Sequence, residues 1–210
     1  MIKGRSGALG SVLRFAASVM IVSGGLLITD AGATVAWQEP ISALLASRQQ
    51  AELGRALEHP PARVIRRKPL PGDAIGKIVM PSIDRSYVVV EGAKTKDLRK
   101  GPGHYADTPL PGERGTVGIA GHRTTHGAPF RHIDSLKPRQ RVILEMPDGT
   151  YVYRVETTKI VDPSQVSVKR KVGYDRLILS ACHPLYSAAQ RIVVFARFVR
   201  REPARVGRRR

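Results

Sequence analysis

Three residues beside apolar segments have the side chains needed for nucleophilic chemistry. Cys182 ends the apolar run 177–181. His122 follows the small-residue segment 115–121, and Arg191 begins the last strand-like segment. A cysteine thiolate is a nucleophile, a histidine exchanges protons near neutral pH, and an arginine stabilises negative charge on oxygen. If the fold brings the three together, they predict covalent acyl transfer through a thioester.

Each of these residues also has an ordinary structural explanation. Free cysteine is often buried, a loop histidine usually lies at the surface, and an arginine at a strand start often forms a surface ion pair. Cys182 is the single cysteine of the 210 residues, so it cannot form an internal disulfide. In an exported chain such a lone thiol either pairs between molecules or reacts.

A metal site is the other chemistry that this region suggests. His122 and His126 have the i, i+4 spacing of zinc ligands on a helix. Gly127 and Pro129 argue against a helix there, and no acidic or cysteine third ligand accompanies the pair. We therefore expect neither a metal nor another cofactor, with calcium dependence left open.

The N-terminal region contains an uncharged stretch that is suited to a membrane. Residues 15–29 carry no charge, and extension to Trp37 gives about 22 residues, enough to cross ~30 Å of hydrocarbon. Basic residues precede the stretch and acidic residues follow it, so the positive-inside rule keeps the N-terminus cytoplasmic. We predict a cytoplasmic segment 1–14 and an uncleaved anchor 15–37. The alternative is a signal peptide cleaved after Ala33.

A stalk and a β-rich domain are predicted to follow. In the stalk, residues 38–72, the segment 42–57 has weak helical periodicity, and His59-Pro60-Pro61 ends it before a basic, proline-containing linker. Strand-like runs then occur at residues 74–80, 87–90, 115–120, 141–146, 150–161, 176–181 and 191–199. Many short strands, few helices and no βαβ rhythm predict a mostly-β domain over 73–199, built as a closed or nearly closed antiparallel-rich barrel.

The net charge of the chain indicates which classes of molecule it could bind. Lys and Arg total 35 against 17 acidic residues, a net charge of +18, which favours anionic partners such as nucleic acid, acidic lipids or wall polymers. Six of the last eleven residues are arginines, which predicts a disordered basic tail over 200–210. A nucleic-acid binder would explain the charge, but the export segment and an aromatic content of 5% argue against it.

The sequence around the three candidate residues resembles the sortase family. The blocks are GIAGHR at 118–123, LILSAC at 177–182 and RIVVFA at 191–196. The string CHPLYSAAQR at 182–191 is most similar to class E sortases of high-GC Gram-positive bacteria. The resemblance covers roughly residues 74–199 and the anchor-and-stalk layout. It implies an eight-stranded barrel with a few short helices, in which Cys182 is the nucleophile, His122 the general acid/base and Arg191 the electrostatic stabiliser.

The same resemblance implies a function. Sortases are membrane-bound cysteine transpeptidases that cleave an LPxTG-type or LAxTG-type sorting signal between Thr and Gly and pass the acyl group to an amine of a peptidoglycan precursor. The expected partners are secreted proteins with a sorting signal, a lipid II-like acceptor and the membrane, but no nucleic acid. One departure is Ala181, which stands where the family usually has threonine. The alternatives are a pilin-polymerising sortase and a non-catalytic, basic, envelope-binding barrel.

Overall fold

The computed structural model describes residues 5–37 and 40–204, in two units divided at residues 40 and 41. The first unit holds helix α1 (Arg5–Trp37), whose stretch Gly10–Ala33 is long and apolar enough to cross a membrane. The helix begins before the predicted anchor of 15–37, because residues 5–14 contain no proline that would end it.

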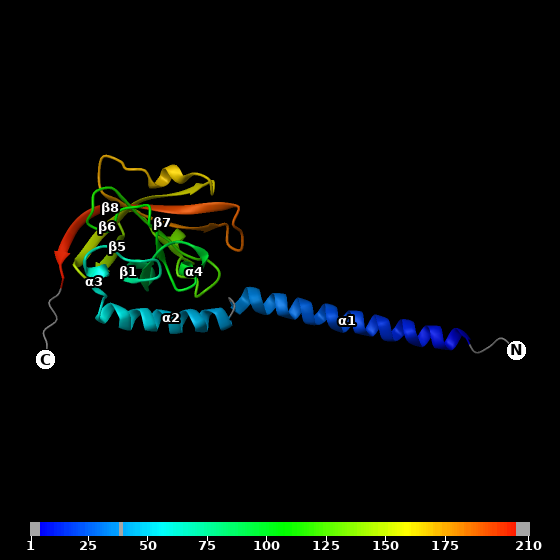
Figure 1. Cartoon of the computed structure of the whole chain (residues 1–210). Helices are drawn as coiled ribbons and strands as arrows, with labels where there is room; N and C mark the ends of the chain where they lie inside the picture. Colours follow the sequence, from blue (N-terminus) through cyan, green and yellow to red (C-terminus); the bar gives the residue numbers. More distant parts are fainter. Residues whose placement is uncertain (1–4, 38–39, 205–210) are drawn as a thin grey trace. The chain divides into compact units, whose positions relative to one another are not determined.

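Residues 41–58 and 62–65 of the region predicted as a stalk are helical and lie beside the barrel (Figure 1). Helix α2 (Pro40–Glu58) contains the predicted helical segment, and the short helix α3 (Ala62–Ile65) follows it. The Gln50 side chain holds α2 in place: its Nε2 donates to the carbonyl oxygens of Val88 (3.1 Å) and Lys100 (2.7 Å), while its Oε1 accepts from the Val88 N–H (2.7 Å). From residue 41 onward the predicted stalk and linker therefore belong to the same compact unit as the barrel.

Eight strands close into the barrel. They are β1 (Ala74–Met80), β2 (Arg85–Glu91), β3 (Gly103–His104), β4 (Thr116–Ala120), β5 (Arg141–Met146), β6 (Gly149–Val161), β7 (Arg176–His183) and β8 (Gln190–Pro203). Their order around the barrel is β1-β2-β3-β4-β7-β8-β6-β5. The pairs β2/β3 and β4/β7 are parallel and the other described pairs are antiparallel. The predicted mostly-β barrel is confirmed.

Short helical turns connect some of the strands. They are α4 (Thr95–Leu98), η1 (Pro81–Ile83), η2 (Ile133–Ser135) and η3 (Val166–Lys169). The few short helices expected beside the barrel are therefore present.

Side-chain alternation divides each strand between the barrel interior and its outer face. Leu177 and Leu179 of β7 and Val194 of β8 belong to the large interior cluster. Between them, Ile178 and Val193 belong to a smaller cluster on the opposite face of the same strands. Burying a side chain of this size stabilises the fold by ~1.5–3 kcal/mol. The apolar run that precedes Cys182 is thus continuous because both faces of β7 are covered.

The C-terminal strand extends into the predicted tail. β8 reaches Pro203, and its last residues pair with the start of β6, with Arg200 opposite Val152 and Pro203 opposite Gly149. We predicted disorder over 200–210, but the first part of this range supplies the backbone partner that β6 needs. Residues 205–210 lie outside the described residues.

Candidate active site

The register of three neighbouring strands places the predicted site residues side by side. In the parallel pair β4/β7, Ala120 lies opposite Ser180, and two further residues along each chain lead to His122 and Cys182. In the antiparallel pair β7/β8, Cys182 lies directly opposite Arg191. The structure therefore brings His122, Cys182 and Arg191 to one level at one end of the barrel.

Alternation places Cys182 and Arg191 on the outer face of the barrel. Ala181 and Ile192 belong to the interior cluster, so the adjacent Cys182 and Arg191 face outward. On β4, Ile119 is interior, and His122 is two positions after the outer-facing Ala120. Gly118, Ala120 and Ser180 thus lie on the same outer face as the thiol, and all three are buried there.

The His122 ring is partly buried and stacks on the ring of His126. The two ring centroids are 4.8 Å apart, with 26° between the ring planes. Burial lowers the pKa of His122 below its ordinary 6.5, and the positive charges of His126 and Arg99 lower it further. The ring is therefore neutral at pH 7. Its Nε2 is buried and has no hydrogen-bond partner among the described residues, so it is available to accept a proton.

Arg191 is held by its own loop. Its Nη1 donates to the carbonyl oxygens of Ala188 and Gln190, each at 3.0 Å. A guanidinium has five N–H donors, so this arrangement leaves donors for a substrate carbonyl. Cys182 beside it is a free thiol of intermediate exposure.

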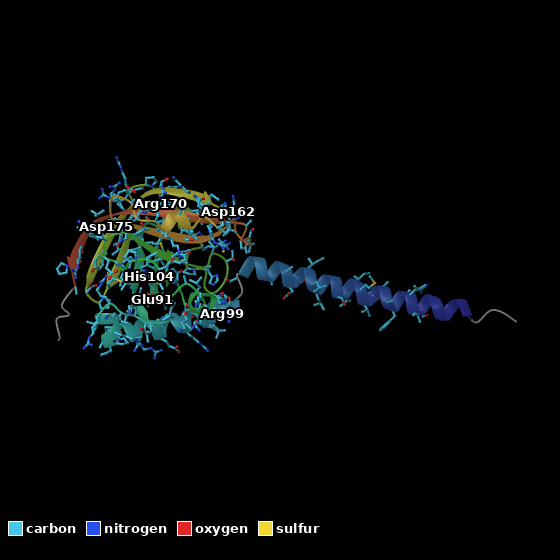
Figure 2. The ribbon with its side chains drawn as sticks, turned by 45° about the horizontal axis from the view of Figure 1, so that its top comes forward. Glu91, Arg99, His104, Asp162, Arg170 and Asp175 are labelled. Carbon is cyan, nitrogen blue, oxygen red and sulfur yellow. The ribbon has the colours of Figure 1, made fainter. Side chains whose placement is uncertain are left out.

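Two connections lie over the outer face of the paired strands β4 and β7. The β6–β7 connection contains η3, and Val168 of η3 packs on the outer-face cluster of Ile178 and Val193. Asp162, Arg170 and Asp175 show where this connection runs along one side of the barrel (Figure 2). Beside it, Tyr105 of the β3–β4 connection lies close over Gly118, where a Cβ atom would come within 2.7 Å of the Tyr105 ring.

Buried polar contacts fix Tyr105. The preceding residue, His104, bonds through Nδ1 to the Glu91 carboxylate at 2.8 Å, and both side chains are buried (Figure 2). The Tyr105 hydroxyl lies 3.5 Å from Ser180 Oγ, and the Lys169 ammonium lies 4.9 Å from the centroid of its ring. Tyr105 was not among the residues predicted from the sequence. Gly118 was the available signal, since glycine in a strand often marks a close approach.

The residue before the nucleophile contributes to packing. Ala181 is 3% exposed and belongs to the interior cluster, on the face of β7 opposite to Cys182. The side chain at this position therefore points into the barrel core and away from the thiol. The threonine hydroxyl that Ala181 lacks would therefore lie in the apolar core, where the methyl group of alanine packs well.

The described residues contain no cluster of three or more His, Cys, Asp and Glu side chains that could hold a metal ion. His122 and His126 face each other ring to ring, an arrangement that does not point two nitrogens at a common metal.

Comparison with known proteins agrees with this geometry. A family model described as the sortase domain matches residues 78–199. Sortase SrtE1 of Streptomyces coelicolor is 32% identical over 154 residues, which cover 66% of this chain and 44% of that protein. Sortase D of Bacillus subtilis is 33% identical over 136 residues, covering 63% of this chain and 67% of that protein. This chain therefore spans less than half the length of SrtE1.

A solved structure shares the fold. The crystal structure of sortase E1 from Streptomyces coelicolor, with a tripeptide in the active site, matches with a TM-score of 0.60 and 31% identity. The match covers 64% of this chain and 93% of that chain. With the family model matched over more than half of its residues and a sortase barrel in its structure, the chain belongs to the sortase family, whose members are cysteine transpeptidases.

Proposed function

We propose that this protein is a cysteine transpeptidase that cleaves an LPxTG-type or LAxTG-type sorting signal between Thr and Gly and transfers the acyl group to an amine of a cell-wall precursor. The observation that carries the proposal is the common level of His122, Cys182 and Arg191 on neighbouring strands. The similarity to SrtE1 and sortase D supports the same reaction class.

In the first half-reaction, Cys182 becomes acylated. Neutral His122 accepts the thiol proton, and the thiolate attacks the Thr carbonyl carbon. The resulting tetrahedral intermediate carries negative charge on oxygen, which the Arg191 guanidinium stabilises. As the carbon–nitrogen bond breaks, the imidazolium gives its proton to the departing glycine amine, and a thioester remains.

The second half-reaction reverses these roles. The acceptor amine attacks the thioester carbonyl, and neutral His122 takes the proton that the amine loses. The sulfur then leaves and recovers its proton from His122, which restores the resting site. Arginine cannot perform the proton transfers, since its guanidinium stays protonated at all working pH values.

Replacement of Arg191 separates charge stabilisation from folding. If Arg191 holds the carbonyl oxygen in the transition state, Arg191→Ala should lower kcat/KM by ~10²–10³, the effect of losing one oxyanion donor. Arg191→Lys should recover only part of this loss, because lysine keeps the charge but lacks the planar fork. Steady-state kinetics measures kcat/KM of both variants, and circular dichroism verifies that they fold. Near-normal turnover of a folded Arg191→Ala variant would remove Arg191 from the mechanism.

We further propose that α1 anchors the protein, with its N-terminus in the cytoplasm and the barrel outside. The long apolar stretch of the helix and the basic residues before it support this orientation. A barrel outside the membrane would meet secreted proteins with sorting signals as they emerge, and would meet lipid-linked wall precursors at the same surface.

One experiment tests both reaction and orientation. Protoplasts carrying the full chain receive peptides with varied sorting signals, together with a wall-type side-chain amine or a pilin-like lysine peptide. Mass spectrometry should find a thioester on Cys182 and a Thr–amine product, in equal yield from intact and permeabilised protoplasts. Absence of product from both would favour the non-catalytic envelope-binding barrel. Product only after permeabilisation would overturn the orientation, and preference for the lysine peptide would favour a pilin polymerase.

A further inference from the structure

The residues that directly follow His122 and Cys182 bond to each other. Arg123 Nη1 lies 3.2 Å from His183 Nδ1, and Arg123 Nη2 lies 2.8 Å from the Asp134 carboxylate. The Arg123 side chain is only 3% exposed, whereas Asp134 is half exposed. A partly buried side-chain contact therefore connects the segment that carries His122 with the strand that carries Cys182.

The chemistry of the contact determines the form of His183. Arginine only donates hydrogen bonds, so His183 Nδ1 is the acceptor and the ring carries its hydrogen on Nε2. Burying a guanidinium away from water is costly unless its charge and its N–H groups find partners. Asp134 supplies the charge and His183 an acceptor, while Arg123 Nε is buried with no partner among the described residues. The contact therefore joins the two segments at the level where the proposed chemistry requires a fixed spacing.

The bond lies just beyond the two proposed catalytic residues. Backbone pairing of the segments extends to the bond from Gly121 N–H to the Ser180 carbonyl oxygen, at 3.0 Å, which precedes both His122 and Cys182. The Arg123–His183 bond follows both of them. The general acid/base and the nucleophile are thus bracketed, with a backbone bond on one side and a side-chain bond on the other.

We propose that Arg123 and His183 are positioning residues that hold His122 and Cys182 at the spacing needed for proton transfer. The proposal rests on the proposed function, because it concerns the same two catalytic residues. Neither Arg123 nor His183 takes part in a chemical step. Proton transfer requires its two atoms to approach within hydrogen-bond distance, so a small displacement of either residue lowers the rate steeply.

Substitutions at His183 separate this role from general stability. Asparagine places a carbonyl oxygen where Nδ1 stands and preserves the acceptor, whereas leucine removes it. With the full chain in detergent micelles, His183→Leu should lower kcat by ~10–100-fold with KM within about twofold, the scale of a misplacement near 1 Å. His183→Asn should retain kcat within about threefold. Arg123→Met carries the same test should His183→Leu not fold.

Three controls make the test specific. Arg123→Met and His183→Leu break the same bond, so their double variant should be no slower than the slower single variant. Asp134→Asn keeps an oxygen that accepts from Arg123 Nη2 at a half-exposed position, so the Arg123–His183 bond stays in place and kcat should fall less than threefold. Arg200→Met removes an exposed arginine paired with Glu202, far along β8, and should leave kcat unchanged. Additive losses in the double variant, a His183→Asn as slow as His183→Leu, or a full loss in Asp134→Asn would overturn the proposal.

A readout without substrate keeps this inference separate from the transpeptidase proposal. The rate of Cys182 alkylation by iodoacetamide depends on how readily His122 accepts the thiol proton. We expect wild type and His183→Asn to react fastest, and His183→Leu to fall toward the rate of His122→Ala. If wild type cleaves no sorting signal but this order of alkylation rates holds, the proposed function fails and the positioning role stands. Equal alkylation rates in all variants would overturn the positioning role.

Discussion

Replacing Cys182 with alanine should abolish both peptide cleavage and acyl transfer. The chain has no other thiol, so no second residue can form the thioester. We expect a loss of ~10⁶-fold, the scale found when a nucleophile is removed from an enzyme that works through a covalent intermediate. Cleavage of a fluorogenic sorting-signal peptide, with mass spectrometry of the intact protein for the thioester, measures the two steps.

Cys182→Ser is the matched control for this substitution. Serine retains the shape and polarity of the side chain, but its hydroxyl is far less ionised than a thiol at neutral pH. The serine variant should therefore fold as wild type, bind the peptide and turn over almost as poorly as the alanine variant. Cleavage at a normal rate by folded Cys182→Ala would show that the thiol is not the nucleophile and that the shared level of the three residues has another purpose.

The sequence was sufficient to predict most of the strands because they depend on local patterns, while the catalytic roles of the three site residues stay predictions. Alternating and continuous apolar runs predicted seven of the eight strands, and small residues before His122 indicated a strand end close to other backbone. The two-residue strand β3 was missed, since two residues are too few for any period. Its position depends on the buried Glu91–His104 pair, which joins residues far apart in the sequence.

Contacts between distant segments account for the other differences. The Gln50 side chain bonds to the backbone of Val88 and Lys100. No local pattern in the sequence predicts that a weakly amphipathic helix will dock on these backbone groups. The final arginines looked like a solvated tail, yet part of that range continues β8 because the start of β6, paired with β5 on one edge, offers its other edge to β8. The strand register also depends on contacts between distant segments. The parallel pairing of β4 with β7, which aligns His122 with Cys182, follows from barrel closure.

The roles of His126 and Arg123 were missed because they depend on neighbours that only the folded barrel supplies. His126 was interpreted as a surface histidine and rejected as a zinc ligand, whereas the structure stacks it against His122, where its charge lowers the pKa of the neighbouring ring. Arg123 resembled any other basic residue of a strongly basic chain. Its burial and its bond to His183 depend on two strand ends meeting, and that meeting is a property of the closed barrel.

Replacing His122 with alanine should be almost as severe as losing the nucleophile. Both half-reactions pass a proton through this ring, so its loss affects acylation and transfer alike. General acid–base catalysis contributes ~10²–10⁴-fold in rate. Because His122 acts in both half-reactions, we expect kcat/KM of His122→Ala to fall by ~10⁴-fold, the upper end of this range. The kinetics of the same fluorogenic peptide measure the loss, with circular dichroism to verify folding.

The pH dependence gives this prediction its sharpest form. In wild type, the pKa of His122 lies below 6.5 because of burial and the charges of His126 and Arg99. A protonated ring cannot take the thiol proton, so kcat/KM should fall as the pH drops through this lowered pKa and should be insensitive to His122 between that value and neutral pH. His126→Gln removes one of the positive charges and should move the inflection toward higher pH, while leaving the rate at pH 7.5 within about threefold.

The residual activity of His122→Ala should lack this acid inflection, because the group that titrates is gone. Added imidazole, which fits the space left by the ring and carries a free nitrogen, should restore part of the rate, and the restored rate should follow the ordinary pKa of the free base. A His122→Ala variant that folds, keeps the wild-type inflection and gains nothing from imidazole would exclude His122 as the acid/base. The buried, unpartnered Nε2 of His122 would then need a different explanation, with His126 the first ring to test.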